Sequence, residues 1–457
     1  MTTKTRQKIH YVILVISVSA LLTFGGGVYG DLSASSDDTY RSLKIFSDVI
    51  EQLENNYVEE VDSKELIQKA IQGMVRGLDP HSEYLPPDAL ELLQDDTKGE
   101  FSGVGIVITV RKGMLTVVSP IEGTPAYQAG IKAGDIIYKV DGTPAKEITI
   151  SEIVKKIKGP KGTSVTLTIL RKGSPKPIDF KLVRNVIPIE SVKYIMLNSK
   201  YGYVRIYNFT EKTTYDLEDA LDKLESGETE FKGLIMDIRD NPGGLLPQAI
   251  GVSELFLEEG TILSIKGRLE KHTQIYNAHK NEKKRDYPII VLINGGSASA
   301  SEIVAGALQD NKRALVLGTT SFGKGSVQTV KTMRDGSGLK FTIARYYTPS
   351  GRSIQAKGIK PDIILKRKAI EEAETKEDWE DIYDVKEKDL KNHLDAEPDK
   401  KTEKNTKSGK EEESTSDSNL DDTEFSPLNL KTLMSDNQVS RALDILVSYE
   451  IFKNLKE

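Results

Sequence analysis

The chain has 457 residues, a formal net charge of −6, 38% hydrophobic residues and no cysteine. This length predicts two or three domains with sizeable cores. The lack of cysteine excludes a disulfide framework, a thiolate nucleophile and a cysteine-based zinc site. No long basic stretch is present, so we expect no nucleic acid partner.

Residues 1–37 predict a cytoplasmic tail followed by a membrane anchor or signal peptide. Lys4, Arg6 and Lys8 precede an apolar run over residues 11–29. Positive residues followed by about 19 apolar or small ones are typical of such segments, with the charged end in the cytoplasm. Because Leu32-Ser-Ala34 is a poor cleavage site, an uncleaved anchor is favoured over a signal peptide. The remainder of the chain is then expected outside the cytoplasm, in the periplasm or cell envelope.

Residues 38–98 predict a helical region, and residues 99–185 a β-rich domain. Leu43, Phe46, Val49 and Leu53 share one helical face. This apolar face needs a partner, either the body of the protein or a second subunit, and we expect self-association. The next segment has short β-branched strands, glycine turns and two short helices near residues 126–129 and 150–158.

Strands alternate with helices over residues 186–370, which predicts an α/β core. We expect strands over 233–239, 288–293 and 314–318, and helices over 246–257 and 300–309. Residues 371–425 are rich in Lys, Glu, Ser, Thr and Asp and predict a flexible charged linker. The last segment, 426–457, contains a predicted helix over 439–452.

A serine cluster marks the end of one buried strand. Ser297, Ser299 and Ser301 follow the apolar run over 288–293 and open the next predicted helix. Ser299-Ala-Ser-Glu302 fits a capping box, so Ser299 has a purely structural interpretation. The unpaired N–H groups of a helix N-terminus also suit a developing oxyanion, which favours a nucleophile here. The local sequence does not choose among the three serines.

Lys324 lies between Gly323 and Gly325 after the next predicted strand. Lysines in glycine turns are usually solvated, and this one can act as a base only if burial lowers its pKa from about 10.4 towards 7–8. Gln328 is placed to orient the amine. The segment nearly matches a phosphate-binding loop, but Gly325 stands where Ser or Thr should hold Mg²⁺.

A third element, Asp237-Ile-Arg-Asp-Asn-Pro-Gly243-Gly244, ends another buried strand. The glycines are expected in a tight turn. Their N–H groups are candidates for one half of an oxyanion hole, with the N–H of Ala300 as the other half. No metal-ligand spacing is present among the five histidines, so we expect no metal and no cofactor.

These segments, with Gly77-Leu-Asp-Pro-His-Ser-Glu-Tyr-Leu85 and Phe101-Ser-Gly-Val-Gly-Ile106, resemble the carboxyl-terminal processing (tail-specific) proteases. That family contains exported or membrane-associated Ser/Lys endopeptidases. The resemblance covers residues 46–365 and implies Ser299 as nucleophile, Lys324 as base and Gln328 as the residue that orients the lysine. Glu302 and Asp310 match acidic positions near the site. The implied fold is α+β and multidomain, with a crotonase-like protease core, a PDZ domain and an N-terminal helical region.

The PDZ resemblance has a physical basis in the glycine loop Gly103-Val104-Gly105-Ile106. Its N–H groups are suited to a terminal carboxylate, and the following strand edge to β-augmentation by a peptide. Protein substrates are therefore expected to bind by apolar C-terminal tails, and an adaptor protein is a further candidate partner. Two other functions compete: a non-catalytic PDZ scaffold for envelope proteins, and an acyl-CoA enzyme on a crotonase-like core.

Overall fold

The computed structural model describes residues 38–111, 113–147, 150–368, 386–395 and 428–455. Two compact units are present, Met1–Val75 and Arg76–Glu457. The apolar run over 11–29 lies outside the described residues. Within the ranges described, every helix is too short or too polar to cross a membrane.

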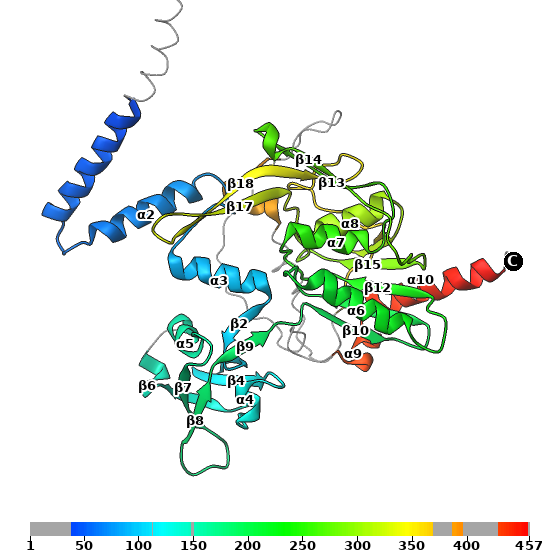
Figure 1. Ribbon diagram of the computed structural model, residues 1–457, viewed down its shortest axis with the longest axis horizontal. Helices are drawn as coiled ribbons and strands as arrows, with labels where there is room; N and C mark the ends of the chain where they lie inside the picture. Colours follow the sequence, from blue (N-terminus) through cyan, green and yellow to red (C-terminus); the bar gives the residue numbers. More distant parts are fainter. Residues whose placement is uncertain (1–37, 112, 148–149, 369–385, 396–427, 456–457) are drawn as a thin grey trace, which may run out of the picture. The chain divides into compact units, whose positions relative to one another are not determined.

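The first unit contains a helix over residues 38–56 and α2 (Ser63–Arg76) (Figure 1). Asp62 Oδ1 accepts the Lys64 N–H at 2.8 Å, which caps the start of α2. Large apolar side chains are exposed on both helices: Leu43, Ile45, Phe46, Val49, Leu53, Ile67 and Met74. The apolar faces predicted from the sequence are thus present and solvent-exposed.

The second unit begins with a short strand that the sequence pattern did not reveal. β1 (Glu83–Leu85) pairs antiparallel with the distant β18 (Gly338–Tyr347), and α3 (Pro87–Lys98) follows. Pro87 opens α3 at its first turn, and Gly99 ends it with φ 72°. A three-residue strand is too short to show the alternation of apolar and polar residues by which strands are recognised in a sequence. Its pairing partner also lies about 250 residues away (338 − 85 = 253), so no local pattern reveals it.

A small β-rich domain follows, entered and left through the antiparallel pair β2 (Glu100–Gly103) and β9 (Asn185–Pro188). Its sheet has the strand order β3-β4-β5-β7-β8. The bounds are β3 (Ile106–Arg111), β4 (Met114–Pro120), β5 (Ile136–Val140), β7 (Ser164–Leu170) and β8 (Ile178–Val183), with β6 (Thr143–Pro144) paired to β5. The connections hold α4 (Pro125–Gln128), the 3₁₀ turn η1 (Ala145–Glu147) and α5 (Ile150–Ile157). Alternate residues of β7 are buried in the core of this domain.

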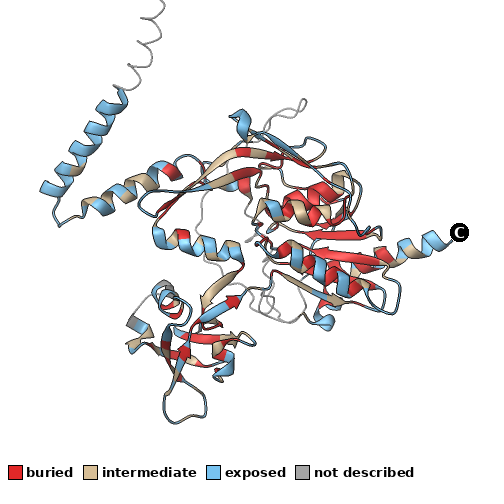
Figure 2. Cartoon of the chain, in the orientation of Figure 1, coloured by how far each residue is buried: buried red, intermediate tan, exposed pale blue. Residues whose placement is uncertain are grey.

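The larger α/β core is built on a six-stranded sheet. Its order is β10 (Val192–Met196), β11 (Tyr201–Ile206), β12 (Gly233–Asp237), β15 (Ile289–Ile293), β16 (Leu315–Gly318) and β19 (Ile363–Ile364). Within this sheet, β11, β12, β15, β16 and β19 are parallel, and β10 is antiparallel at the edge. Every residue of β12 and β15 is buried (Figure 2). Burial on both faces explains why these strands are continuous apolar runs in the sequence.

Helices cover the two faces of this sheet. On one face, α6 (Thr213–Glu225), α7 (Leu246–Glu254) and α8 (Ala300–Asp310) share a core with Val204, Leu234 and Val291. On the other face, α9 (Leu430–Ser435) and α10 (Asn437–Asn454) pack on Tyr203 and Leu292. The predicted final helix thus docks on the core and is longer than expected.

A second sheet lies beside the first and frames the lysine loop. The strand order is β1-β18-β13-β14, and β17 pairs with β18. The bounds not yet given are β13 (Thr261–Gly267), β14 (Gln274–Asn277) and β17 (Ser326–Thr332), and the 3₁₀ turn η2 (Glu270–His272) lies between β13 and β14. The loop over 319–325 joins β16 of the first sheet to β17 of the second.

One part of the segment predicted as a flexible linker differs from that expectation. Residues 386–395, including the 3₁₀ turn η4 (Glu387–Asp389), pack against the core with Glu387 0% exposed. The charged composition predicted solvation, but Glu387 has buried polar partners that composition does not reveal. The rest of the segment lies outside the described residues.

Candidate active site

The three serines at the turn from β15 to α8 have hydroxyl groups with different partners. Ser297 Oγ donates to the Ile238 carbonyl at 2.8 Å, and Ser301 Oγ donates to the Asn241 carbonyl at 2.9 Å. The Ser299 hydroxyl donates to no carbonyl within the described structure, and Ser299 is 7% exposed, whereas the other two serines are 0% exposed. Ser299 is therefore the serine of this cluster whose hydroxyl is available to a substrate.

The backbone at Ser299 is strained, with φ 54° and ψ −110° immediately before α8. A positive φ is uncommon for a residue with a side chain and persists only where its surroundings impose it. Asn241 imposes it in part, because its carbonyl accepts the Ala298 N–H at 3.0 Å and its side chain donates to the Ile206 carbonyl at 2.8 Å. A sharp strand-to-helix turn of this kind exposes a serine hydroxyl in other hydrolases.

The buried carboxylate of Glu302 joins the serine turn to the lysine loop. Oε2 accepts the N–H groups of Ser299 and Lys324, each at 2.9 Å. Oε1 accepts the Gly323 N–H at 2.8 Å and the Ser321 hydroxyl at 2.5 Å. Burial raises the pKa of Glu302 to about 7, although these four donors act to lower it. One side chain thus fixes the distance between the two predicted catalytic segments.

Lys324 lies in a largely desolvated position between two glycines with little room for side chains. A Cβ on Gly325 would lie 2.3 Å from the Gln355 nitrogen. Burial lowers the pKa of Lys324 to about 8. The charge of Lys340 acts in the same direction as burial, whereas the carboxylates of Glu387, Glu302 and Asp79 act to raise the pKa, and the value of about 8 is the balance of all these effects. At this pKa a substantial fraction of the amine is neutral near physiological pH and can accept a proton.

Gln328 and Asp310 lie in different surroundings. Gln328 Nε2 donates to Ser326 Oγ at 2.9 Å and to Thr342 Oγ1 at 3.3 Å. These bonds orient the amide nitrogen toward two hydroxyls and leave its oxygen as the group that can accept from an amine. Asp310 is at the far end of α8, where it accepts the Ser350 N–H at 3.0 Å.

The glycine turn after β12 lies directly against Ser299. A Cβ on Gly243 would be 2.8 Å from Ser299 Cβ and 2.9 Å from the Ala300 nitrogen. The Gly243 N–H, however, is donated to Asn241 Oδ1 at 2.8 Å. Of the two predicted glycine donors, Gly244 is therefore the one whose N–H is left for a substrate. Ala300, the first residue of α8, supplies a second N–H at the helix N-terminus.

The glycine loop of the β-rich domain leads into an edge strand. Val104 is 0% exposed and belongs to the domain core, and its carbonyl accepts the Ala126 N–H at 2.9 Å. Gly105 has φ 76°, and a Cβ there would lie 2.3 Å from Thr124. Gly103 ends β2, and Ile106 begins β3, which pairs only with β4 within the described sheet. The other edge of β3 is thus open to an added strand.

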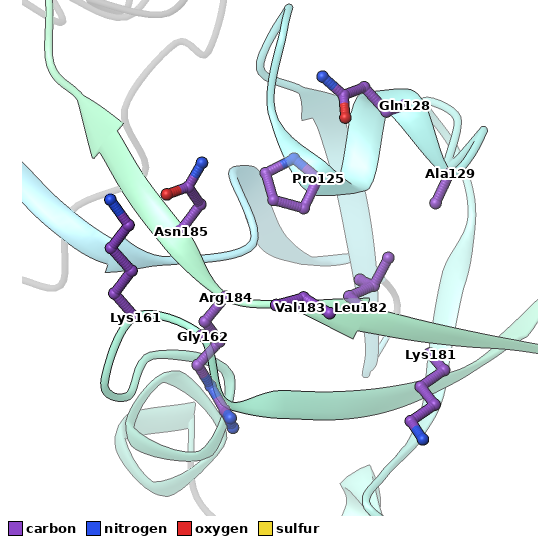
Figure 3. A pocket seen from close by; sticks show the side chains of 10 residues that line it. All are labelled: Pro125, Gln128, Ala129, Lys161, Gly162, Lys181, Leu182, Val183, Arg184 and Asn185. Atoms are coloured by element: carbon purple, nitrogen blue, oxygen red, sulfur yellow. The ribbon is translucent and has the colours of Figure 1, made fainter.

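A separate pocket of about 400 Å³ lies elsewhere on this domain (Figure 3). Pro125 and Gln128 of α4 and Leu182 and Val183 of β8 line it. It does not include the glycine loop. Arg184 also lines it but donates its side chain to backbone carbonyls, among them that of Lys156 at 2.6 Å. This hollow is therefore distinct from the open edge of β3.

Sequence reasoning missed several polar residues around the lysine loop. Gln355 Oε1 accepts the Gly325 N–H at 2.9 Å, and Gln355 Nε2 donates to Glu387 Oε1 at 2.9 Å. His81 Nε2 lies 2.7 Å from Glu387 Oε2. No local motif joins these residues, which are brought together only by the fold. Within the described ranges, no group of three or more His, Asp or Glu side chains is arranged to hold a metal ion.

Comparison with known families gives three matches along the chain. Residues 200–365 match peptidase family S41, residues 116–171 a PDZ domain, and residues 29–89 the N-terminal domain of the activating protease CtpB. The first match contains Ser299, Lys324 and the glycine turn. The second covers most of β4 and all of β5, β6 and β7, and β3 and β8 flank it.

Individual relatives agree with these matches. A carboxy-terminal-processing protease of Bartonella bacilliformis is 45% identical over 364 residues, covering 79% of this chain and 83% of the relative. The carboxy-terminal processing protease CtpA of Bacillus subtilis is 37% identical, covering 79% of this chain and 77% of the relative. The solved photosystem II D1 C-terminal processing protease is 32% identical, covers 70% of this chain and 92% of that chain, and has a TM-score of 0.43.

The fold class predicted from the sequence, a mixed α/β protease core with a PDZ domain, is confirmed by these matches. The resemblance to the carboxyl-terminal processing proteases is confirmed as well. The chain belongs to peptidase family S41 and is a serine-type peptidase of the carboxy-terminal processing group.

Proposed function

We propose that this protein is an endopeptidase in which Ser299 is the nucleophile and Lys324 the general base. The observation that carries the proposal is the position of the two residues on either side of the Glu302 carboxylate, which accepts both of their N–H groups at 2.9 Å. The Ser299 hydroxyl, which donates to no carbonyl in the described structure, and the lowered pKa of Lys324 support the same roles.

In the proposed reaction, neutral Lys324 takes the proton of the Ser299 hydroxyl as Oγ attacks the scissile carbonyl carbon. The carbonyl π electrons move to oxygen, and the N–H groups of Gly244 and Ala300 hold the resulting oxyanion. Protonated Lys324 then gives its proton to the leaving amine as the C–N bond breaks. A water molecule, deprotonated by Lys324, hydrolyses the acyl-enzyme and regenerates the Ser299 hydroxyl. Gln328 orients the lysine amine through its side-chain oxygen.

The substrates are proposed to be proteins captured by their C-terminal tails. The open edge of β3 supports β-augmentation, and the partly buried Ile106 and Ile108 offer apolar contacts for the last side chains. The names of the relatives, which are carboxy-terminal processing proteases, are consistent with action near carboxyl termini. We further propose that Gly103 and Gly105 hold the tail carboxylate, and that an adaptor protein can deliver substrates.

The location and assembly of the protein are also part of the proposal. Basic residues followed by the apolar run over 11–29 support a membrane anchor with the protease outside the cytoplasm. The exposed apolar faces of the helix over 38–56 and of α2 support a homo-oligomer, because patches of this kind are usually covered by a partner.

The test uses the chain from residue 38 onward and an unstructured protein that ends in apolar residues. Cleavage products are identified by mass spectrometry for the parent, Ser299→Ala and Lys324→Ala. We expect cleavage by the parent and its loss in both variants, with circular dichroism showing that both are folded. Turnover retained by Lys324→Ala would exclude the dyad. Tail binding by all three proteins without cleavage would instead favour a non-catalytic scaffold.

A further inference from the structure

Residues 386–395 hold the backbone just before Lys324. Lys386 Nζ donates to the Thr320 carbonyl at 3.0 Å, and the Glu387 N–H donates to the Phe322 carbonyl at 3.3 Å. Both carbonyls belong to the loop that carries Lys324. A segment that follows this loop by more than 60 residues (386 − 324 = 62) thus forms part of its immediate support.

The Glu387 side chain also holds the backbone just after Lys324, through Gln355. Glu387 Oε1 accepts Gln355 Nε2 at 2.9 Å, and Gln355 Oε1 accepts the Gly325 N–H at 2.9 Å. Gln355 Nε2 donates as well to the Leu394 carbonyl at 3.0 Å, which belongs to the same short segment. The two glycines beside Lys324 allow its loop many backbone conformations, and these hydrogen bonds hold the loop in one of them.

The third connection of Glu387 reaches the start of the second unit. His81 Nε2 lies 2.7 Å from Glu387 Oε2, and the side chain of Glu387 is 0% exposed. Burying a carboxylate is unfavourable unless it is paired and hydrogen-bonded. The surrounding charged residues of the segment, Lys388 and Asp389, are exposed. Glu387 thus differs from its neighbours, because its side chain is buried and each of its two carboxylate oxygens has a partner.

We propose that Glu387 is a positioning residue for Lys324. It holds the backbone of the lysine loop in place both before and after Lys324. The proposal rests on the proposed role of Lys324 as general base. Glu387 touches neither Ser299 nor the predicted tail-binding edge, so its effect passes through the lysine loop. Its carboxylate is one of four charged groups that face Lys324, with Glu302, Asp79 and Lys340, and it favours the protonated amine.

The test compares Glu387→Gln with Asp389→Asn in the cleavage assay, over pH 6 to 10. Both variants remove one negative charge from the same turn, but Asp389 is exposed. Glutamine keeps an oxygen for Gln355, so Glu387→Gln should retain most of its maximal rate. Without the carboxylate the neutral form of the Lys324 amine is favoured. The rise of kcat/KM with pH should therefore move to lower pH, by up to about one pH unit. Asp389→Asn should match the parent.

A second variant, Glu387→Ala, removes both side-chain bonds. We expect its maximal kcat to fall by about 10-fold to 100-fold with KM little changed, because a loosened loop misplaces the base without altering tail binding. Thermal unfolding of all variants shows which of them remain folded. Should Glu387→Ala fail to fold, the pH profile of Glu387→Gln decides the matter.

The proposal is overturned if Glu387→Gln has the parent's pH profile, or if folded Glu387→Ala keeps the parent's kcat. Either result leaves the proposed dyad standing, as long as Ser299→Ala and Lys324→Ala are inactive. Activity in Lys324→Ala would overturn the dyad itself, whatever the Glu387 variants do. The two failures are therefore distinguished within one set of proteins.

Discussion

Arg239 and Asp436 form a buried ion pair, with Nη1 and Oδ2 2.9 Å apart and both side chains at most 5% exposed. Arg239 belongs to the strand end that leads into the glycine turn, and Asp436 caps α10 by accepting the N–H groups of Gln438 and Val439. The pair therefore fastens the C-terminal helix to the element that supplies the predicted oxyanion donors.

Replacing Asp436 should destabilise the protein. Asp436→Ala removes the helix cap and one partner of a buried guanidinium, although Asp237 remains bound to Arg239. We expect the free energy of unfolding to fall by roughly 2–4 kcal/mol, measured by urea denaturation. Asp444→Ala, at an exposed position of the same helix, is the control and should change stability little. Equal stability of the two variants would contradict a structural role for the pair.

The neighbouring serines should separate catalysis from stability. Ser299→Ala should remove cleavage and lower the free energy of unfolding by no more than about 1 kcal/mol, because its hydroxyl donates to no carbonyl in the described structure and only its part in the capping box of α8 is lost. Ser301→Ala should keep cleavage but lose about 1 kcal/mol of stability, since the Asn241 carbonyl loses a buried donor. Cleavage assays and urea denaturation on both variants test this pair. If Ser301→Ala were inactive but as stable as the parent, the assignment of the nucleophile to Ser299 would be wrong.

Cleavage should accelerate with rising pH. Neutral Lys324 is the active form, and its pKa of about 8 means that kcat/KM should rise through pH 7 to 8 and level off above about 9. Below pH 7 the decline should steepen, because Glu302, with a pKa of about 7, takes up a proton and its bonds to the loop weaken. A peptide without groups that titrate in this range gives the profile. Thermal unfolding over the same range is the control, and a flat profile between pH 6 and 9 would contradict a lysine base.

Changing Glu302 to glutamine should harm activity more than the same change at Asp310. An amide has one acceptor oxygen for four donors, and its NH₂ group would oppose an N–H, so the serine turn and lysine loop should separate. We expect kcat to fall by about 100-fold or more. Asp310→Asn, at the other end of α8, should lower stability and leave kcat of the folded fraction close to that of the parent. Stopped-time cleavage assays corrected for the folded fraction compare the two variants.

The fold could be predicted well from the sequence because its strands and helices have strong local signals. The buried strands β12 and β15 are unbroken apolar runs, and α8 begins at a recognisable capping box. β1 escaped prediction because three residues carry no periodicity, and its place is set by pairing with β18. The segment over 386–395 escaped it because its charged composition masks one buried carboxylate.

The local residue patterns predicted the candidate site as a set of motifs, and its roles came only from the resemblance to the carboxyl-terminal processing proteases. All three serines lie among small residues, and only their tertiary partners distinguish them. For Ser297 and Ser301 these are the carbonyls of Ile238 and Asn241, which belong to a different strand end. The engagement of the Gly243 N–H by Asn241 is equally invisible in the sequence, because it depends on the geometry of the turn.

The docking of α10 on the central sheet has a consequence for the timing of folding. Tyr203, Ile235 and Leu292 on that face are covered by Val439, Ala442 and Leu446. During synthesis, a chain that has just completed β19 therefore still exposes an apolar sheet face and leaves Arg239 without Asp436. This face of the sheet is covered only when residues up to 446 are available, so we expect the docking of α10 to be a late step in folding.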